Sequence, residues 1–411
     1  MTNLPEDFIR ETRQVMGEAR FDCFLEALNQ EPPVSIRLNP QTLGDGSFVF
    51  DNVPWCKEGY YLEDRPQFTF DPLFHAGCYY VQEAASMFVT HILRTILSPL
   101  TSYPSPLNIL DMCAAPGGKS TAMLSVIPDD ATLVSNEPIP TRAQILLENI
   151  TKWGADNCIV TNNYPRDFRK AKAKFDLILC DVPCSGEGMF RKDPNAISEW
   201  SLQNVEKCWR LQREIVADAW TCLNPGGILI YSTCTFNIKE NEENVRWIME
   251  EYDAEPLTIP TDPSWHITGS LLPGFDAPVY RFIPGITKSE GLFVCVMKKR
   301  GVRSEECGVR NDKSKKNRSI LNLKVISLPT SHSSLPEGKA DLSYPEALKY
   351  LRGEALTLPS DTPRGLITVT YKGFPLGQVK NIGNRANNLY PKPWRIKTTH
   401  LPTDPVEILP L

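Results

Sequence analysis

The pattern of apolar and polar positions divides this chain of 411 residues into segments of different kinds. In residues 5–30 apolar side chains recur at helical spacing and predict two helices. Residues 34–38 predict a short strand, which the turn-forming pair Asn39–Pro40 closes. Residues 81–98 predict a longer amphipathic helix. We therefore expect an α+β N-terminal region over residues 1–100.

From about residue 107, short apolar runs alternate with helical segments. The apolar runs lie at 107–112, 131–137, 157–160, 175–181 and 226–232, with helices predicted at 141–153 and 201–223. Strands that are buried on both faces read as continuous apolar runs, so the alternation predicts a parallel sheet with helices on both sides. Two more strands, near 279–283 and 292–298, would complete the sheet. The expected fold class is α/β, with a Rossmann-like core over residues 101–300.

The last part of the chain has a different composition. Residues 301–340 are rich in Lys, Ser, Asn and Asp and predict a linker. Residues 341–411 contain a predicted helix at 344–353 and a strand at 366–371, which indicates a small α/β domain. The net charge of the chain is −5, yet residues 362–400 contain seven Lys and Arg and no acidic residue. A local basic patch of this kind can bind phosphates on an acidic protein.

Composition also excludes several classes of protein. The N-terminus is polar and acidic, unlike a secretory signal, and no apolar run approaches the about 20 residues of a membrane helix. The twelve cysteines form no CxxC pair, and the five histidines lack ligand spacing. We therefore expect a cytoplasmic protein with no metal and no membrane contact, in which most thiols are buried. We also expect a monomer.

The first strand of the core is followed by a glycine-containing turn, Asp111 to Ser120, which reads DMCAAPGGKS. It lacks the spacing of a phosphate-binding P-loop. Adjacent glycines let a ligand approach the backbone, and the following helix start with Lys119 suits a carboxylate. Glu137, at the end of the second strand, is a suitable acceptor for ribose hydroxyls. A glycine turn alone is weak evidence, but with Glu137 and Asp181 it predicts a nucleotide-type site.

Two cysteines follow the fourth and fifth strands of the predicted sheet. Cys184 lies in DVPCSGEG and Cys234 in YSTCT, so both fall at the edge that carries the glycine turn. Asn237 followed by Glu240 resembles a helix N-cap with its capping-box partner. A helix start at that place favours the thiolate form of Cys234. A single cysteine is usually a buried hydrophobe, but this pair predicts nucleophilic chemistry.

At these residues the chain resembles the Sun/Nop family of RNA 5-methylcytosine methyltransferases, and most closely its bacterial ribosomal-RNA branch, the RsmF type. The matching blocks are SIRLNP (35–40), QEAASM (82–87), DMCAAPGGKS (111–120), the NE pair (136–137), DVPCSGEGMFRKD (181–193) and YSTCTFNIKENEENV (231–245). The segment GNRANNLYPKPWRI (383–396) resembles the PUA-like RNA-binding module of that branch. The resemblance covers most of the chain.

The resemblance implies a class I methyltransferase core that uses S-adenosyl-L-methionine, with a PUA-like C-terminal domain. The cofactor-binding residues it implies are Cys113, Ala114, Ala115, Pro116, Gly117, Gly118, Lys119, Glu137, Arg142 and Asp181. Cys234 is then the nucleophile that adds to carbon 6 of cytosine, which makes carbon 5 able to accept a methyl group. By the same resemblance Cys184 assists product release. From its place at the end of the fourth strand, Asp181 is also expected to stabilise the charge that develops at N3 of the base.

One position departs from the family pattern. The family commonly carries an acidic residue near the third strand that contacts the adenine. Here Tyr164 stands at that place, and Asp167 is the available substitute.

RNA is the expected partner, and it could be ribosomal RNA within a small subunit. The expected RNA contacts are Arg37, Asn39, Arg191, Lys192, Arg385, Tyr390 and Trp394, because cations and stacking aromatics read splayed RNA. A transfer-RNA methyltransferase with the same chemistry, an RNA-binding ribosome-assembly protein with a vestigial core, and a small-molecule methyltransferase are the alternatives. A target base inside a helix must be extruded to reach Cys234.

Overall fold

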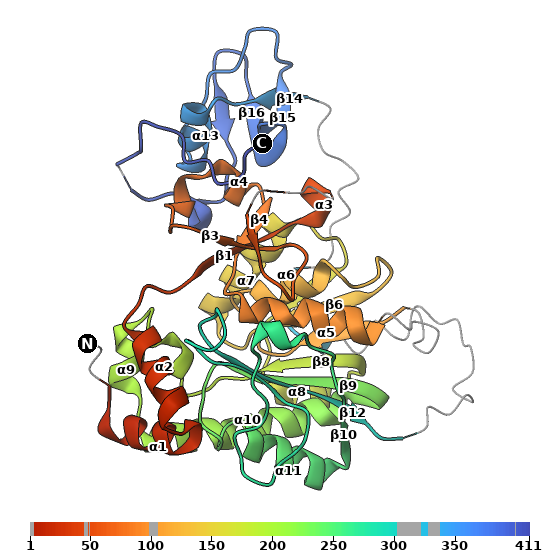
Figure 1. The fold of residues 1–411 in the computed structure, drawn as a ribbon. Coiled ribbons are helices and arrows are strands. Elements are labelled where there is room, and N and C mark those ends of the chain that lie inside the picture. The colour runs from red at the N-terminus through yellow and green to blue at the C-terminus, as the bar shows by residue number, and fades with distance from the viewer. Residues whose placement is uncertain are drawn as a thin grey trace.

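A computed structural model describes residues 4–44, 48, 50–97, 106–301, 322–327, 338–398 and 400–411. Three sheets follow one another along the chain (Figure 1). The strands are β1 (Val34–Leu38), β2 (Asp51–Asn52), β3 (Gly59–Leu62), β4 (Tyr79–Val81), β5 (Asn108–Asp111), β6 (Thr132–Asn136), β7 (Cys158–Thr161), β8 (Phe175–Asp181), β9 (Leu223–Thr233), β10 (Ala254–Pro256), β11 (Tyr280–Phe282), β12 (Leu292–Lys299), β13 (Val325–Ser327), β14 (Lys339–Asp341), β15 (Gly365–Tyr371), β16 (Phe374–Asn381) and β17 (Ala386–Asn388).

The helices surround these sheets. They are α1 (Glu6–Met16), α2 (Glu18–Leu28), α3 (Pro40–Leu43), α4 (Pro72–His75), α5 (Phe88–Leu97), α6 (Gly118–Leu124), α7 (Pro140–Trp153), α8 (Pro165–Lys170), α9 (Pro194–Glu199), α10 (Leu202–Cys222), α11 (Glu242–Tyr252) and α13 (Tyr344–Leu351). Short 3-10 turns lie at Phe68–Phe70, Ala85–Met87, Glu187–Met189, Pro263–Trp265 and Lys392–Trp394.

The central sheet has the order β10-β12-β9-β8-β5-β6-β7-β13, with β11 paired to β12. Strands β5 to β9 pair in parallel, as their continuous apolar runs predicted. Alternate residues of β5 enter opposite cores. Ile109 packs in the core that contains Ile92 and Leu146, while Leu110 packs in the core that contains Val216. The Rossmann-like α/β core is therefore confirmed.

Two local predictions are wrong. The helix expected at 81–98 begins only at Phe88, because Tyr79–Val81 forms β4 and Ala85–Met87 forms a 3-10 turn. The linker expected at 301–340 contains β13, which pairs antiparallel with β7 and adds an edge strand to the central sheet. The other linker residues lie mostly outside the described part of the chain.

The N-terminal sheet, ordered β2-β3-β1-β4, lies between the central domain and the C-terminal domain (Figure 1). Its buried residues share one hydrophobic core with α13, β15 and β16. His75 Nδ1 lies 3.2 Å from the Tyr390 hydroxyl, and Tyr344 donates to the Phe70 carbonyl at 3.1 Å. The C-terminal domain is therefore packed firmly on the N-terminal sheet.

Arg37 ties the N-terminal sheet to the central domain. Its fully buried guanidinium donates to Gln82 Oε1 at 2.7 Å, to Ser125 Oγ at 2.9 Å and to Thr121 Oγ1 at 2.6 Å. It also lies 4.4 Å from the centre of the Trp153 ring. Burial lowers its pKa to about 10, which still leaves it charged at neutral pH.

We expect Arg37→Met to lower the free energy of unfolding by about 2–4 kcal/mol, because Gln82 Oε1 loses its hydrogen-bond partner and Thr121 and Ser125 each lose a hydrogen bond from the buried guanidinium. Denaturant unfolding of the full chain measures this change. Arg10→Met is the control, since Arg10 is exposed and should change stability by less than about 0.5 kcal/mol. Equal small effects of the two substitutions would contradict the structural role of Arg37.

Candidate active site

The glycine turn joins β5 to α6 at the carboxyl end of the sheet. Gly117 has a φ of +116°, which side-chain-bearing residues rarely adopt. A Cβ on Gly118 would lie 3.4 Å from the Tyr80 ring and 3.5 Å from Gln82 Nε2. The turn is thus a close-packed cradle whose backbone faces the edge where such sheets bind ligands.

Glu137 and Arg142 flank this cradle from β6 and α7. Glu137 Oε1 accepts from the Ile139 amide at 2.9 Å, and Oε2 lies 3.5 Å from Arg142 Nη1. Arg142 also donates to the Ala115 carbonyl at 2.9 Å. Arg142 therefore braces both Glu137 and the turn.

Asp181 connects the turn with the last two parallel strands. Its Oδ2 accepts from Lys119 Nζ at 2.8 Å, and its Oδ1 accepts from Ser232 Oγ at 2.7 Å. Burial alone would lower the pKa of Lys119, but the Asp181 carboxylate outweighs it, and the pKa lies above its usual value. Cys234 acts on the pKa of Lys119 in the same direction, because it lies within electrostatic range of the ammonium group. Cys234 and the glycine turn thus belong to one site.

The two cysteine sulfurs are in contact. Cys184 Sγ lies 3.2 Å from Cys234 Sγ, and both residues are partly exposed. The contact with Cys234, followed by burial, raises the pKa of the Cys184 thiol well above its usual value. Cys184 is therefore a neutral thiol beside Cys234 at neutral pH.

Two buried carboxylates hold the cysteine loops against each other. Glu187, from the loop after β8, accepts from the amides of Phe236 at 2.6 Å and Asn237 at 3.1 Å. Glu240, from the loop after β9, accepts from the Ser185 amide at 3.0 Å. Each loop thus supplies a carboxylate that binds the backbone of the other. We call Glu187 and Glu240 the carboxylate clasp.

Polar side chains complete the clasp. Asn237 Nδ2 lies 3.0 Å from Glu187 Oε1 and 2.8 Å from Glu240 Oε1, and Gln212 donates to Glu240 at 2.6 Å. Burial, and then the charge of Glu187, raise the pKa of Glu240 to about 7. Sequence reasoning missed the clasp, because only the folded loops bring Glu187 next to the backbone at Phe236.

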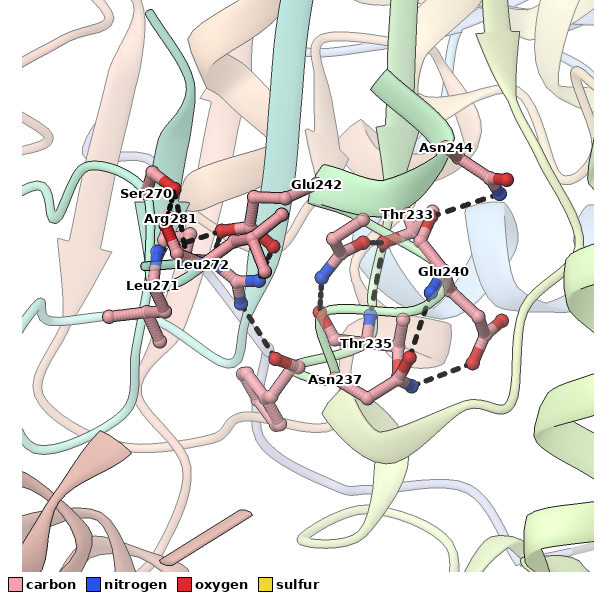
Figure 2. Close-up of polar contacts among 12 residues, drawn as sticks. Thr233, Thr235, Asn237, Glu240, Glu242, Asn244, Ser270, Leu271, Leu272 and Arg281 are labelled. Carbon is pink, nitrogen blue, oxygen red and sulfur yellow. Dashed lines mark hydrogen bonds and ion pairs between the residues drawn. The ribbon is translucent and has the colours of Figure 1, made fainter. Parts of the chain in front are cut away.

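The predicted helix start after Cys234 is wrong. Helix α11 begins at Glu242, while Asn237 and Glu240 form a turn, in which the Glu240 amide donates to Asn237 Oδ1 at 2.9 Å (Figure 2). Helix stabilisation of the thiolate therefore does not operate as expected. The loop is instead anchored by the fully buried ion pair of Glu242 and Arg281, whose Nη1 also donates to the Phe236 carbonyl at 2.7 Å.

The structure corrects several predicted RNA contacts. Arg37 and Asn39 are fully buried, and Asn39 Nδ2 donates to the carbonyls of Gly77 and Trp153 at 2.9 Å each. Tyr390 is 3% exposed, in the core shared with the N-terminal sheet. The Arg191 side chain is 6% exposed and pairs with Glu290 at 2.9 Å. Each of these side chains serves the fold in place of contacting solvent.

The remaining candidates are accessible to different extents. Lys192 and Arg385 are exposed, whereas Trp394 is half-buried with its ring centre 5.7 Å from Lys152 Nζ. Tyr164 is 56% exposed, and Asp167 accepts from the Tyr164 amide at 3.0 Å, so Asp167 caps α8. These contacts do not connect Tyr164 or Asp167 with the glycine turn.

Sequence analysis could not predict that Lys324 lies near Glu137. Asn162 donates to the Glu137 carbonyl at 2.8 Å, and Lys324 donates to Asn162 Oδ1 at 2.6 Å. Lys324 precedes β13 inside the predicted linker, and no local pattern indicates that it returns to β7.

Within the described residues, no helix is both long and apolar enough to cross a bilayer, and no cluster of His, Cys, Asp and Glu could hold a metal ion. A Rossmann-like core with a glycine turn after its first strand and an acid after its second strand is the architecture of a class I methyltransferase.

Comparison with known proteins identifies the family. The family model described as 16S rRNA methyltransferase RsmB/F matches residues 100–298, the model of the RsmF N-terminal domain matches 4–84, and that of the RsmF PUA domain matches 338–396. The chain belongs to the RsmB/F family of 16S rRNA methyltransferases.

Named relatives agree with the family models. Ribosomal RNA small subunit methyltransferase F from Enterobacter sp. (strain 638) is 28% identical over 94% of this chain and 95% of its own length. The protein of the same name from Cronobacter sakazakii is 33% identical, over 72% of this chain and 63% of its own length. The chain thus spans less than two thirds of the second relative.

Solved structures show the same fold. The methyltransferase homolog protein from Pyrococcus horikoshii has a TM-score of 0.60 and 26% identity, over 72% of this chain and 96% of that chain. NSun6 from Pyrococcus horikoshii has a TM-score of 0.58 at 20% identity, over 72% of this chain and 99% of that one.

Asp111 makes stability depend on pH. Its side chain is buried beneath the turn and accepts from Ser120 Oγ at 2.7 Å. Burial raises its pKa from 3.8 to about 7. The stability that this raised pKa contributes is fully present below about pH 4 and is lost as pH rises through 7.

We expect Asp111→Asn to reduce the fall in Tm between pH 5 and 8, measured by thermal unfolding. A fall as steep as that of the wild type would contradict this account.

Proposed function

We propose that the chain methylates carbon 5 of a cytosine in 16S rRNA through a covalent bond between Cys234 Sγ and carbon 6 of the base. The observation that carries the proposal is the contact of two thiols, 3.2 Å apart, on loops beside the Lys119–Asp181 pair. Family membership supports the substrate class, and the basic C-terminal domain fits an RNA partner.

The cofactor of this proposal is S-adenosyl-L-methionine. The proposed cofactor-binding residues are the turn from Cys113 to Lys119, with Glu137, Arg142 and Asp181. This set fits the cofactor chemically, because it offers a glycine cradle, a carboxylate for ribose hydroxyls and cations for an amino-acid carboxylate. When bound, the cofactor supplies an electrophilic methyl group for carbon 5.

Cys234 is the first residue of the chain to react with the cytosine. Its thiolate adds to carbon 6, and the electrons of the 5,6 double bond move so that carbon 5 becomes nucleophilic. The Lys119–Asp181 pair is the proposed group that stabilises the charge developing at N3 of the ring. After methylation, solvent water takes the carbon 5 proton, the electrons of that C–H bond re-form the 5,6 double bond, and Cys234 leaves carbon 6 as a thiolate.

Cys184 assists the step in which the bond between Cys234 and carbon 6 breaks. Its neutral thiol can donate a hydrogen bond to the departing Cys234 thiolate, because the two sulfurs are in contact. Removal of this donor should slow breakage of the bond to carbon 6 more than its formation. The proposed role of Cys184 is thus product release.

The proposed RNA contacts outside the thiol pair are exposed residues of the C-terminal domain, Arg385 among them, together with Lys192 near the catalytic loops. The cytosine must be unstacked to reach sulfurs that lie at the sheet edge. A single-stranded or opened site in the small subunit is the expected target.

Bisulfite sequencing of rRNA and transfer RNA from a strain in which this protein is deleted tests the function. We expect loss of a 5-methylcytosine in 16S rRNA that the wild-type chain restores and Cys234→Ala does not. Cys208→Ala, on α10, is the matched control and should restore the mark. An unchanged rRNA profile together with a lost transfer-RNA mark would move the substrate to transfer RNA, and restoration by Cys234→Ala would remove its proposed role.

A further inference from the structure

Strand β13 returns to the central sheet from the segment that joins the catalytic core to the C-terminal domain. It pairs antiparallel with β7, which separates it from β6. Leu323 and Val325 pack in the core that contains Val216, and Ile326 packs against the core that contains Leu146. The short segment is therefore anchored in the cores on both faces of the sheet.

Two asparagines that follow β7 bind every polar group of Lys324. Its amide donates to Asn163 Oδ1 at 2.9 Å, and its carbonyl accepts from the Asn162 amide at 2.9 Å and from Asn163 Nδ2 at 3.2 Å. Its ammonium donates to Asn162 Oδ1 at 2.6 Å. These bonds fix Lys324 on the carboxyl end of β7, although its side chain is exposed.

Asn162 extends this contact to Glu137. Its Nδ2 donates to the carbonyls of Glu137 at 2.8 Å and Pro138 at 3.0 Å. An ammonium group only donates hydrogen bonds, so Lys324 draws the Asn162 oxygen toward itself and leaves the amide nitrogen for the two carbonyls. The Glu137 carboxylate accepts from the Ile139 amide at 2.9 Å, so the backbone that Asn162 binds also sets the place of the carboxylate.

Asn163 extends the contact to the start of the glycine turn. Its amide donates to Asn136 Oδ1 at 3.0 Å, and Asn136 Nδ2 donates to the Asn163 carbonyl at 2.9 Å and to the Met112 carbonyl at 3.1 Å. Asn162 and Asn163 are both buried. A shift of either amide would leave buried groups unpaired, so the network holds its members in one arrangement.

We propose that Lys324 is a positioning residue of the S-adenosyl-L-methionine site and acts by holding Glu137, through Asn162, where its carboxylate can accept from the ribose hydroxyls. This inference rests on the proposed methyltransferase function and its cofactor. The family models match residues 100–298 and 338–396, so Lys324 lies in a part of the chain that neither of these models covers. Cofactor binding and the docking of β13 then strengthen each other by the same factor.

The test is a double-mutant cycle on the full-length protein. Lys324→Met, Glu137→Gln and the double variant are made, and the Kd for S-adenosylhomocysteine, a stable product of the cofactor, is measured by titration calorimetry. Lys324→Arg is the conservative variant, which keeps the donor. Lys298→Met is the matched control, because Lys298 is an exposed lysine on β12 of the same sheet.

We expect Lys324→Met to raise the Kd about fivefold, because the carboxylate loses one support of its position. In the Glu137→Gln background the same substitution should raise the Kd less than about twofold, since residues that act through one another are not additive. Lys324→Arg and the Lys298→Met control should bind as the wild type does.

Hydrogen exchange gives a second readout that needs no activity. In the wild type, S-adenosylhomocysteine should slow the exchange of a peptide that covers residues 323–327. The peptide that contains β10, at the opposite edge of the sheet, should not change and serves as the control.

The outcomes separate this inference from the proposed function. If the wild type binds S-adenosylhomocysteine and Lys324→Met binds it equally well, the positioning role is overturned and the function stands. The same holds if Lys324→Met raises the Kd by one factor in both backgrounds, or if exchange at 323–327 responds no more than at β10. A wild-type protein that binds no S-adenosylhomocysteine would instead remove the proposed cofactor and the function with it.

Discussion

The carboxylate clasp is the constraint on which the site depends. Two loops from neighbouring strands would otherwise move independently, and a 3.2 Å contact of their sulfurs would not persist. Glu187 and Glu240 prevent this, because each binds backbone amides of the opposite loop. A buried carboxylate is unfavourable without partners, so these hydrogen bonds both compensate its burial and fix the loops in register.

The rest of the molecule supports that geometry from several sides. Asp181 joins the glycine turn to β9 through Lys119 and Ser232. Aromatic side chains of the N-terminal helices pack beneath the loops, where the ring centres of Phe24 and Phe236 lie 5.0 Å apart. The N-terminal sheet is held to α6 by Arg37 and to the C-terminal domain by a common core. Cofactor turn, thiol pair and basic domain are thus parts of one packed body (Figure 1).

Much of this was readable from the sequence, because it depends on local periodicity. Continuous apolar runs gave the parallel strands, and strand ends at Asp181 and Cys234 placed both cysteine loops at the edge of the glycine turn. The wrong predictions have a common cause, because the features concerned depend on contacts between residues that are distant in the sequence. Arg37 looked like a surface cation, although its partners are 45 to 88 residues away.

The turn after Cys234 failed for a related reason. Asn237 and Glu240 have the spacing of a capping box, but their side chains are drawn into the clasp, and the helix starts later, at Glu242. Tertiary hydrogen bonds to Glu187 outweighed the local preference of this segment for a helix start. Strand β13 was missed because its apolar pair, Val325 and Ile326, is too short to stand out within a polar segment, and its partner strand β7 is distant in the sequence.

The central claim is that the sulfur of Cys234 bonds to the pyrimidine ring. Its most direct test is peptide mapping by mass spectrometry of protein–RNA adducts formed with cofactor and target rRNA. The account predicts that Cys184→Ala accumulates an adduct on the peptide that contains residue 234, while Cys234→Ala and the double variant form none. An adduct in Cys234→Ala, attached through Cys184, would contradict it.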